Sequence, residues 1–264
     1  MTDFATIHLS TDTRGVTTLT LNRPQKHNAM DAAMIADLSA ACAQIAADPA
    51  IRVVILSGGE AASFCAGGDL GWMREQMGLD RPTRMKEARK LAEMLRELNE
   101  LPKPVIGRIH ANAFGGGVGL ASCCDVAIGV EGAKLGLTET RLGLIPATIG
   151  PYVIARMGEA RARRVFMSSR IFEAAEAREL GLLARVVIPE ALDAAVEREV
   201  APYLAVSPVA VASAKALARR LGPVIDDAVI DDTVERLADT WETDDAVEGI
   251  AAFFEKRKAG WVTA

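Results

Sequence analysis

Residues 109–120 read Ile-His-Ala-Asn-Ala-Phe-Gly-Gly-Gly-Val-Gly-Leu and join a predicted strand to a predicted helix. The apolar run 104–107 precedes this stretch, and small residues from Val118 to Cys124 continue it as a helical pattern. Glycines permit a tight turn and let a ligand approach the backbone closely. The first amides of a helix lack intrahelical acceptors and carry partial positive charge. The stretch therefore predicts a site that stabilises an anion, either a phosphate or a carbonyl oxygen that gains charge during a reaction.

A second turn with free amides is expected at residues 63–70, Ser-Phe-Cys-Ala-Gly-Gly-Asp-Leu. It follows the strand-like run Val-Val-Ile-Leu-Ser at residues 53–57, so it also lies at the end of a buried strand. Two such turns together can direct a pair of backbone N–H donors at one oxygen atom. We interpret the two glycine-rich stretches as two halves of one site.

Five motifs in order along the chain resemble those of the crotonase superfamily, the enoyl-CoA hydratases and isomerases. The resemblance runs nearly from end to end, and several motifs in order are far more specific than a single one. Besides the two glycine-rich turns, the motifs are Leu-Thr-Leu-Asn-Arg-Pro with Asn-Ala-Met at residues 19–30, Leu-Thr-Glu-Thr-Arg-Leu-Gly-Leu-Ile-Pro at residues 137–146, and Gly-Ile-Ala-Ala-Phe-Phe-Glu-Lys-Arg-Lys at residues 249–258.

The resemblance implies an α/β fold, a crotonase-type spiral of ββα units with a C-terminal helical oligomerisation region. The expected division is a core with the active site at residues 1–201 and a trimerisation region at residues 202–264. The apolar periodicity independently indicates strands alternating with helices. The segment between Gly71 and Arg84 is predicted as irregular. An ordinary surface loop is the preferred interpretation, and the resemblance implies the alternative of a mobile border of the acyl pocket. Strands are expected at residues 6–9, 17–21, 53–56, 105–109, 126–128 and 185–187, and helices at residues 31–47, 82–100, 208–221, 223–241 and 244–258.

The amino-acid composition limits which binding partners and which cellular compartment are expected. The chain has 264 residues, of which 50% are hydrophobic, and a net charge of −5 that argues against a nucleic-acid binder. The four cysteines lack the spacing of a zinc site or a disulfide framework, and free thiols are typical of a reducing cytoplasm. No apolar stretch is long enough for a bilayer, and Met1–Phe4 has no signal-peptide character. We expect a cytoplasmic protein with no metal and no nucleic-acid or membrane partner.

The resemblance assigns an oxyanion hole to the backbone N–H groups of Ala66 and Gly116. Moving a proton beside a thioester carbonyl places charge on its oxygen, and two preorganised donors stabilise that charged state selectively. Related hydratases hold one water molecule between two glutamates. Their second glutamate matches Glu139, whereas Gly119 occupies the position of the first. The chain therefore keeps one acid/base and lacks the other.

Glu139 is the strongest candidate for a catalytic acid or base. A carboxyl group in an apolar pocket has a raised pKa, which suits proton transfer near neutral pH. The alternative is a surface partner of Arg141, two residues away. Asp125 is interpreted as a hydrogen-bonding group at a helix end, and His110 as a core histidine at the end of a strand.

A single glutamate supports two reactions. It can activate water and protonate C2 in a hydratase, or move a proton between C2 and C4 of a 3-enoyl-CoA in an isomerase. We expect the hydratase, because the glycine triplet and residues 137–152 together resemble bacterial hydratases of branched glutaconyl-CoA thioesters, the 3-methylglutaconyl-CoA hydratase-like members of leucine and terpene breakdown. A non-catalytic protein that binds acyl-CoA or RNA is the alternative from another class.

The expected partner is an acyl-CoA thioester bound by a homotrimer or a dimer of trimers, with CoA as part of the substrate and no further cofactor. CoA is expected to lie across the turn at residues 63–70. Phe253 and Lys256 match residues that reach the CoA of a neighbouring subunit, although Lys256 is equally well explained as a basic helix end. The predicted substrate-binding set is Lys26, His27, Ala66, Gly68, Asp69, Leu70, Gly115, Gly116, Phe253 and Lys256.

Overall fold

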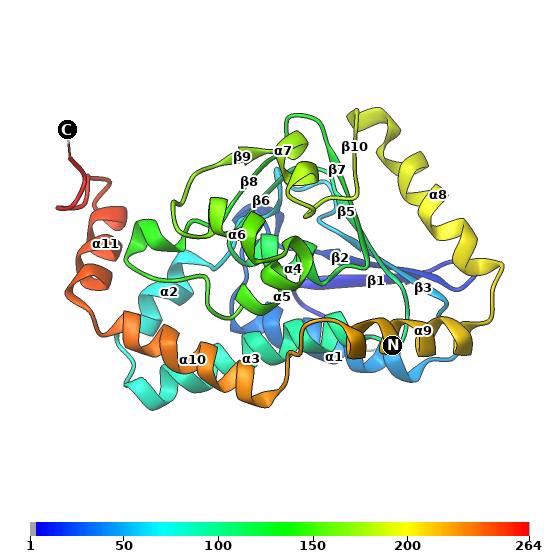
Figure 1. The fold of residues 1–264 in the computed structure, drawn as a ribbon, viewed down its shortest axis with the longest axis horizontal. Helices are drawn as coiled ribbons and strands as arrows, with labels where there is room; N and C mark the ends of the chain where they lie inside the picture. The colour runs from blue at the N-terminus through cyan, green and yellow to red at the C-terminus, as the bar shows by residue number, and fades with distance from the viewer. Residues whose placement is uncertain (1–3, 264) are drawn as a thin grey trace.

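Two β-sheets form the centre of the molecule in the computed structural model, which describes residues 4–263 (Figure 1). The larger sheet has the strand order β1-β2-β3-β5-β7-β10. β1 runs antiparallel to β2, and all other neighbours in this sheet are parallel. Its strands are β1 (Ile7–Thr11), β2 (Val16–Leu21), β3 (Val53–Ser57), β5 (Val105–Ile109), β7 (Val126–Val130) and β10 (Arg185–Val187).

The smaller sheet has the order β4-β6-β8-β9. Three of its strands follow directly on strands of the larger sheet, β4 after β3, β6 after β5 and β8 after β7, and a helical segment follows each pair. This repeat confirms the ββα architecture that the resemblance implied. The sequence pattern does not predict these four strands, which are only two or three residues long and show little alternation. They are β4 (Ser63–Cys65), β6 (Asn112–Phe114), β8 (Lys134–Gly136) and β9 (Phe172–Glu173).

The parallel strands are apolar on both faces because helices cover the sheet. Four of the five residues in each of β3, β5 and β7 are buried. Helix α8 (Leu192–Leu204) packs against these three strands. Helix α4 (Gly116–Cys123), in which every residue is buried, contacts β4, β5 and β6. The N-terminus of α4 is thereby fixed at the boundary between the two sheets.

Aspartate N-caps fix where two helices near that boundary begin. Asp69 accepts hydrogen bonds from the first amides of α2 (Leu70–Met77), and Asp80 caps α3 (Arg81–Glu100) in the same way. The prediction of an irregular loop between Gly71 and Arg84 is therefore wrong. Most of that segment is helical, and the two caps are the signal that identifies it.

The C-terminal part consists of three helices, as predicted, with corrected bounds. They are α9 (Pro208–Leu221), α10 (Asp227–Trp241) and α11 (Asp244–Phe254). Helix α10 begins four residues later than predicted because Asp226 is its N-cap. Helix α11 ends before Lys256, whose φ of 55° is incompatible with a helix.

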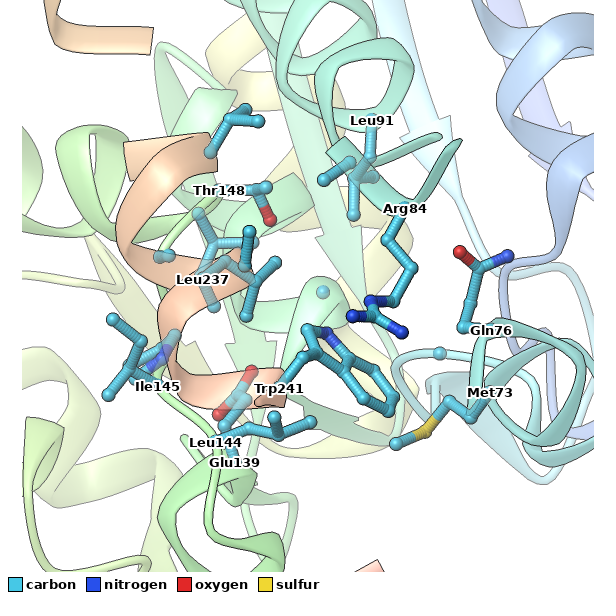
Figure 2. Close-up of a pocket in the computed structure, with 18 of the residues that line it drawn as sticks. Met73, Gln76, Arg84, Leu91, Glu139, Leu144, Ile145, Thr148, Leu237 and Trp241 are labelled. Carbon is cyan, nitrogen blue, oxygen red and sulfur yellow. The ribbon is translucent and has the colours of Figure 1, made fainter. Parts of the chain in front are cut away.

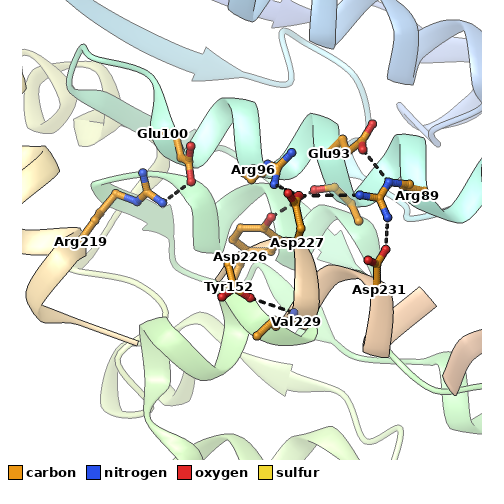
Figure 3. A network of polar contacts seen from close by, with 11 residues as sticks. Arg89, Glu93, Arg96, Glu100, Tyr152, Arg219, Asp226, Asp227, Val229 and Asp231 are labelled. Carbon is orange, nitrogen blue, oxygen red and sulfur yellow. Dashed lines mark hydrogen bonds and ion pairs between the residues drawn. The ribbon is translucent and has the colours of Figure 1, made fainter. Parts of the chain in front are cut away.

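Ion pairs attach α10 to α3 (Figure 3). The Asp227 carboxylate lies 2.6 Å from the guanidinium of Arg96, and Arg89 contacts both Asp227 and Asp231. Such partly exposed pairs contribute little individually, but together they select one position of α10 along α3. Ala92, Ile230 and the neighbouring apolar side chains pack beneath them.

Residues 1–3 and residue 264 lie outside the part of the chain that the structure describes, and part of the signal-peptide prediction rests on residues 1–3. The elements not yet named are all helical. Within residues 4–263, no single helix combines the length and hydropathy needed to cross a membrane; residues 189–204 and 208–221 meet that test only jointly, across a bend of 107°. The elements are η1 (Pro24–Lys26), α1 (Ala32–Ala47), η2 (Glu139–Leu142), α5 (Gly150–Met157), α6 (Glu159–Phe166), α7 (Ala174–Glu179) and η3 (Pro189–Ala191).

Candidate active site

A mostly apolar cavity lies at the N-terminus of α4 (Figure 2). It brings together Gly68, Gly116 and Glu139, which are far apart in the sequence. Its wall comes from α2, α3, the segment 144–149 and α10. The apolar lining side chains are those of Met30, Trp72, Met73, Met85, Ala88, Leu91, Leu144, Ile145, Pro146, Ala147, Ile149, Val234, Leu237, Ala238 and Trp241.

The glycine triplet keeps the first amides of α4 accessible. Gly115 has a left-handed φ of 48°, and its N–H group donates to the Gly136 carbonyl at 2.9 Å. The Gly115 carbonyl in turn accepts the N–H groups of Val118 and Gly119. The N–H group of Gly116 has no backbone acceptor within the described part of the chain. It is the first amide of α4 and is available to a ligand in the cavity.

The turn after β4 is attached to Met30 on both sides of Gly68. The Met30 N–H group donates to the Gly67 carbonyl at 2.7 Å, and the Asp69 N–H group donates to the Met30 carbonyl at 2.7 Å. Between these bonds, the Gly68 N–H group donates to no backbone carbonyl of residues 4–263. Gly68 therefore offers a second free amide to the same cavity.

Ala66 does not fit the predicted role of oxyanion donor. Its N–H group donates to the His27 carbonyl at 3.0 Å and is thus already occupied. His27 can turn its carbonyl this way because its backbone is left-handed, with a φ of 52°. The geometry supports Gly68 and Gly116 as the donor pair, so one predicted residue is replaced and the other is retained.

The Asp69 side chain holds this turn in place. Its Oδ1 atom accepts hydrogen bonds from Gly71 (2.8 Å) and Trp72 (3.2 Å), and its Oδ2 atom lies 3.2 Å from Arg23. Burial opposes ionisation, but the bonds from Trp72 and Gly71 and the nearby Arg23 keep the pKa of Asp69 below its ordinary value. Arg23 also pairs with Asp31 at 2.8 Å, which connects the turn to α1.

Glu139 lies beside the two free amides, at the first position of η2. Its Oε2 atom is buried and has no hydrogen-bond partner among residues 4–263. A Cβ atom placed on Gly115 would lie only 2.9 Å from Oε1, so the carboxyl group directly adjoins the glycine turn. Burial raises the pKa of Glu139 to about 7.

The alternative of a surface pair between Glu139 and Arg141 is wrong. Arg141 donates instead to the carbonyl of Ser169 at 3.2 Å. No ion pair of Glu139 occurs anywhere in the region that the structure describes. An unpaired carboxyl group with a pKa near neutrality can both accept and return a proton at physiological pH.

Ile149 occupies the space beside Gly119 that a second carboxylate would need. A Cβ atom on Gly119 would lie 2.5 Å from Cγ2 of Ile149. Ile149 is 3% exposed and also lines the cavity. An apolar side chain therefore fills the place beside Gly119 where related hydratases have their first glutamate.

Two other polar residues have structural roles, as predicted. Asp125 accepts a hydrogen bond from Val105 N–H at 2.7 Å and forms an ion pair with Lys215, also at 2.7 Å. His110 bonds through Nε2 to the Ala61 carbonyl at 2.8 Å, and burial lowers its pKa. Neither residue lines the cavity.

The predicted CoA-binding residues separate into two groups. Phe253 lines a cleft next to Glu139 in its own chain, so it does not need a neighbouring subunit to approach the site. Ala66, Gly68, Leu70 and Gly115 line the same cleft. Lys26, His27, Asp69 and Lys256 line neither the cavity nor the cleft.

Sequence reasoning misses the contribution of α10. Val234, Leu237, Ala238 and Trp241 recur at helical spacing and form one wall of the cavity. The division that placed the active site within residues 1–201 is therefore incomplete. The spacing indicates that this face is buried, but it does not identify what covers it.

Sequence reasoning also misses Gln76 and Arg84, polar side chains on α2 and α3 that line the cavity, as Thr148 does from the segment 144–149. Their signal is faint, because Gln76 stands in a segment predicted as a loop and Arg84 in the first turn of a predicted helix. Within residues 4–263, no three His, Cys, Asp or Glu side chains are grouped to hold a metal ion. The arrangement combines two free amides with one proton-transferring carboxyl group in an apolar cavity, which suits charge development on a carbonyl oxygen.

Comparisons with known proteins point to the same chemistry. A sequence model of the enoyl-CoA hydratase/isomerase family matches residues 11–263. YngF of Bacillus subtilis (strain 168) is 36% identical over 249 residues, which cover 91% of this chain and 92% of YngF. The mitochondrial methylglutaconyl-CoA hydratase of Mus musculus is 32% identical over 262 residues, which cover 95% of this chain and 80% of that protein. The crystal structure of an enoyl-CoA hydratase from Shewanella pealeana superposes with a TM-score of 0.80 at 36% identity and covers 98% of this chain and 96% of that one.

Proposed function

Because the chain belongs to the enoyl-CoA hydratase/isomerase family, we propose that it adds water across the double bond of a 2-enoyl-CoA thioester. The observation that carries this proposal is the position of Glu139. Its buried carboxyl group has a free Oε2 atom and lies in the same cavity as the free amides of Gly68 and Gly116. Hydration needs this combination, because charge develops on the thioester oxygen while one proton is taken up and returned.

The thioester oxygen lies between the N–H groups of Gly68 and Gly116 in the proposed complex. Attack on C3 moves the electron pair of the double bond toward C1 and leaves the thioester oxygen as an enolate. Two fixed amides stabilise that enolate more than the neutral thioester, which lowers the barrier. Loss of one such donor typically raises a barrier by about 3–4 kcal/mol.

Glu139 serves as base and then as acid. The ionised carboxylate takes a proton from water while the water oxygen bonds to C3. The enolate then collapses, and the protonated carboxyl group returns that proton to C2. One water molecule is consumed and Glu139 is regenerated, so the steps balance with a single carboxyl group.

A second candidate is isomerisation of a 3-enoyl-CoA to a 2-enoyl-CoA. The observation that favours it is the contact of Ile149 with Gly119, which leaves an apolar wall where related hydratases hold water between two glutamates. In this reaction Glu139 removes a proton from C2 and returns it to C4. The same two amides stabilise the intermediate dienolate.

The acyl group of the proposed substrate is a branched glutaconyl group, as in 3-methylglutaconyl-CoA. This finer assignment is supported by the motif at residues 137–152 and by the 32% identity to methylglutaconyl-CoA hydratase of Mus musculus. CoA enters as part of the substrate, in the cleft lined by Leu70, Gly115 and Phe253, and no further cofactor is proposed.

The proposed assembly is a cytoplasmic homotrimer or dimer of trimers. Helix α9 supports this proposal, because none of its residues is buried within the chain. Val209, Leu217 and Leu221 are between 59% and 79% exposed, an apolar face that association would cover. A non-catalytic acyl-CoA- or RNA-binding role is less well supported, because the net charge is −5 and the Glu139 site is intact.

The test follows the absorbance of the enoyl-thioester band with 3-methylglutaconyl-CoA, crotonyl-CoA and a 3-enoyl-CoA. We expect the wild type to remove the band of the 2-enoyl thioesters and Glu139→Gln to lose this activity by at least about a thousandfold. Gain of the band from the 3-enoyl thioester alone would favour the isomerase instead. Equal rates with Glu139→Gln would exclude Glu139 from the chemistry.

A further inference from the structure

We propose that Arg84 and Gln76 form a carboxylate-binding end of the acyl cavity, so that the enzyme selects acyl-CoA thioesters with a second, distal carboxylate. The inference rests on the proposed function only in requiring that the acyl group enters this cavity. It adds the residues that contact the far end of the acyl group. These are distinct from the amides and the carboxyl group that act at the thioester end.

Arg84 is a cation in a mostly apolar cavity, and part of its hydrogen-bonding capacity is unused. Its side chain is 13% exposed, and its Nε atom is buried without an acceptor among the described residues. One terminal nitrogen donates to the carbonyl of Leu79, and the other lies 3.5 Å from Glu242. Glu242 is already bonded to Arg81 at 2.9 Å, so it compensates the Arg84 charge only in part.

Gln76 provides a second polar group at the same end. The residue is 7% exposed, and its amide makes no hydrogen bond to any side chain or backbone group of residues 4–263. Because Gln76 lines the cavity, its amide is open to a ligand or a water molecule there. Gln76 lines the cavity from α2, as Arg84 does from α3.

The two polar groups lie away from the reaction centre. Figure 2 shows the Arg84 guanidinium and the Gln76 amide on one side of the cavity, and Glu139 on the other with the Trp241 ring between them. A substrate held at its thioester by Gly68 and Gly116 would therefore direct the far end of its acyl chain toward Arg84. Apolar side chains line the space between these two ends.

A carboxylate fits this end better than a methyl group. The planar guanidinium of arginine matches a carboxylate, and the bond between two ionised groups is stronger than a neutral one. An acyl chain that ends in a methyl group would displace water from Arg84 and Gln76 without replacing its hydrogen bonds. The cavity therefore favours the diacid and disfavours the plain fatty acyl chain of equal length.

The experiment measures binding, so that it does not depend on hydration. Glutaryl-CoA and pentanoyl-CoA have saturated five-carbon acyl groups and differ only in the terminal carboxylate. Calorimetric dissociation constants of both are compared for the wild type, Arg84→Met, Gln76→Leu and Arg89→Met. Arg89 is the matched control, because it is a guanidinium on the same helix that pairs with Glu93 and Asp231 outside the cavity.

We expect the wild type to bind glutaryl-CoA at least tenfold more tightly than pentanoyl-CoA. Arg84→Met should lower the affinity for glutaryl-CoA by about tenfold to a hundredfold, the effect of losing a hydrogen bond to a charged group. Gln76→Leu should reduce the preference by a smaller factor, and Arg89→Met should retain it.

Equal affinity of the wild type for the two thioesters would overturn the inference. A parallel loss of affinity for both in Arg84→Met would do the same, since it would indicate a general structural defect. If Arg84→Met does not fold, an unchanged preference in Gln76→Leu decides against the inference. A protein that prefers glutaryl-CoA but does not hydrate glutaconyl-CoA would refute the proposed reaction and leave this binding site intact.

Discussion

At the residue scale, the site depends on what surrounds one carboxyl group. Glu139 has no ion-pair or hydrogen-bond partner for Oε2 in the described chain, although an unpaired buried carboxyl group is costly. Ile149 reinforces this isolation by filling the position beside Gly119 where a second carboxylate would stand. The same burial that destabilises the charged form brings the pKa of Glu139 to about 7. Function and stability are therefore in conflict at this residue.

That conflict predicts a pH-dependent gain of stability in Glu139→Gln. The native state keeps the proton of Glu139 up to about pH 7, whereas the unfolded chain releases it near its ordinary pKa of 4.5. Wild-type stability should fall as the pH rises through this window, and a glutamine does not titrate. We expect the variant to exceed the wild type by up to about 3 kcal/mol at pH 8 and by much less at pH 5.

Urea unfolding at the two pH values measures this difference. Glu190→Gln, at an exposed position, is the control and should change the free energy of unfolding little at either pH. A gap between Glu139→Gln and the wild type that is the same at pH 5 and pH 8 would contradict a raised pKa at Glu139.

The place of Glu139 in an apolar cavity can be predicted from the sequence, whereas the identity of the free amides cannot. Glu139 stands in a motif whose resemblance extends over ten residues, and its side chain is the functional group. Residue identity does not show whether a backbone amide is free, because that depends on whether a carbonyl group elsewhere in the fold accepts its hydrogen bond. Ala66 is occupied only because the left-handed backbone of His27 turns a carbonyl toward it. No residue pattern within 63–70 reveals that contact.

At the element scale, the two glycine-rich turns must approach closely for their amides to share one oxygen. Gly67 is one of the points where the two turns approach each other closely. It has a φ of 95°, and a Cβ atom there would lie 3.1 Å from the Phe114 carbonyl oxygen and 3.7 Å from the Gly116 nitrogen. A side chain at this position would strain its own backbone and push the start of α4 away.

Gly67→Ala should therefore lose activity as well as stability. Gly132 is the matched control, because its φ of 79° is similarly left-handed but a Cβ atom there meets nothing within 4 Å. Both alanine variants should lose about 1–2 kcal/mol of stability from backbone strain. Only Gly67→Ala should also lower kcat, by about tenfold or more, because the distance between the two amides changes.

Thermal unfolding and steady-state hydration of a 2-enoyl-CoA separate the two effects. Activity losses of equal size in both variants would mean that strain alone is responsible. An unchanged kcat in Gly67→Ala would show that the amides of the two turns do not act on one oxygen.

Element length decides what the sequence can predict at this scale. Strands of five residues and helices of fourteen or more show their period, and β5 and α9 have the predicted bounds. The three-residue strand β10 also has its predicted bounds, so a short strand is not always missed. The three-residue strands β4 and β6 are missed, although they position both turns. Helix α2 is not predicted because its composition is mixed: Gly71, Arg74 and Glu75 stand among its methionines and interrupt the apolar pattern.

At the scale of the whole molecule, the C-terminal part closes the active site of its own chain. Helix α10 packs on α3 through the ion pairs around Asp227 and places Trp241 in the cavity that contains Glu139 (Figures 2 and 3). The sequence cannot predict this, because an amphipathic helix shows that one face is covered but not by which segment. Division into a core at residues 1–201 and an assembly region at residues 202–264 therefore separates residues that line one cavity.

This arrangement predicts that Glu139 and Trp241 cannot be supplied by different chains. Trp241→Ala should open the cavity to water and lower kcat/KM by about tenfold or more, and Glu139→Gln removes the acid/base. When the two variants are refolded together, every cavity with Glu139 lacks Trp241, and every cavity with Trp241 lacks Glu139. The mixture should show only the sum of the separate activities, with mixed oligomers verified by mass-tagged chains. Activity clearly above that sum would mean that α10 covers the cavity of a neighbouring chain.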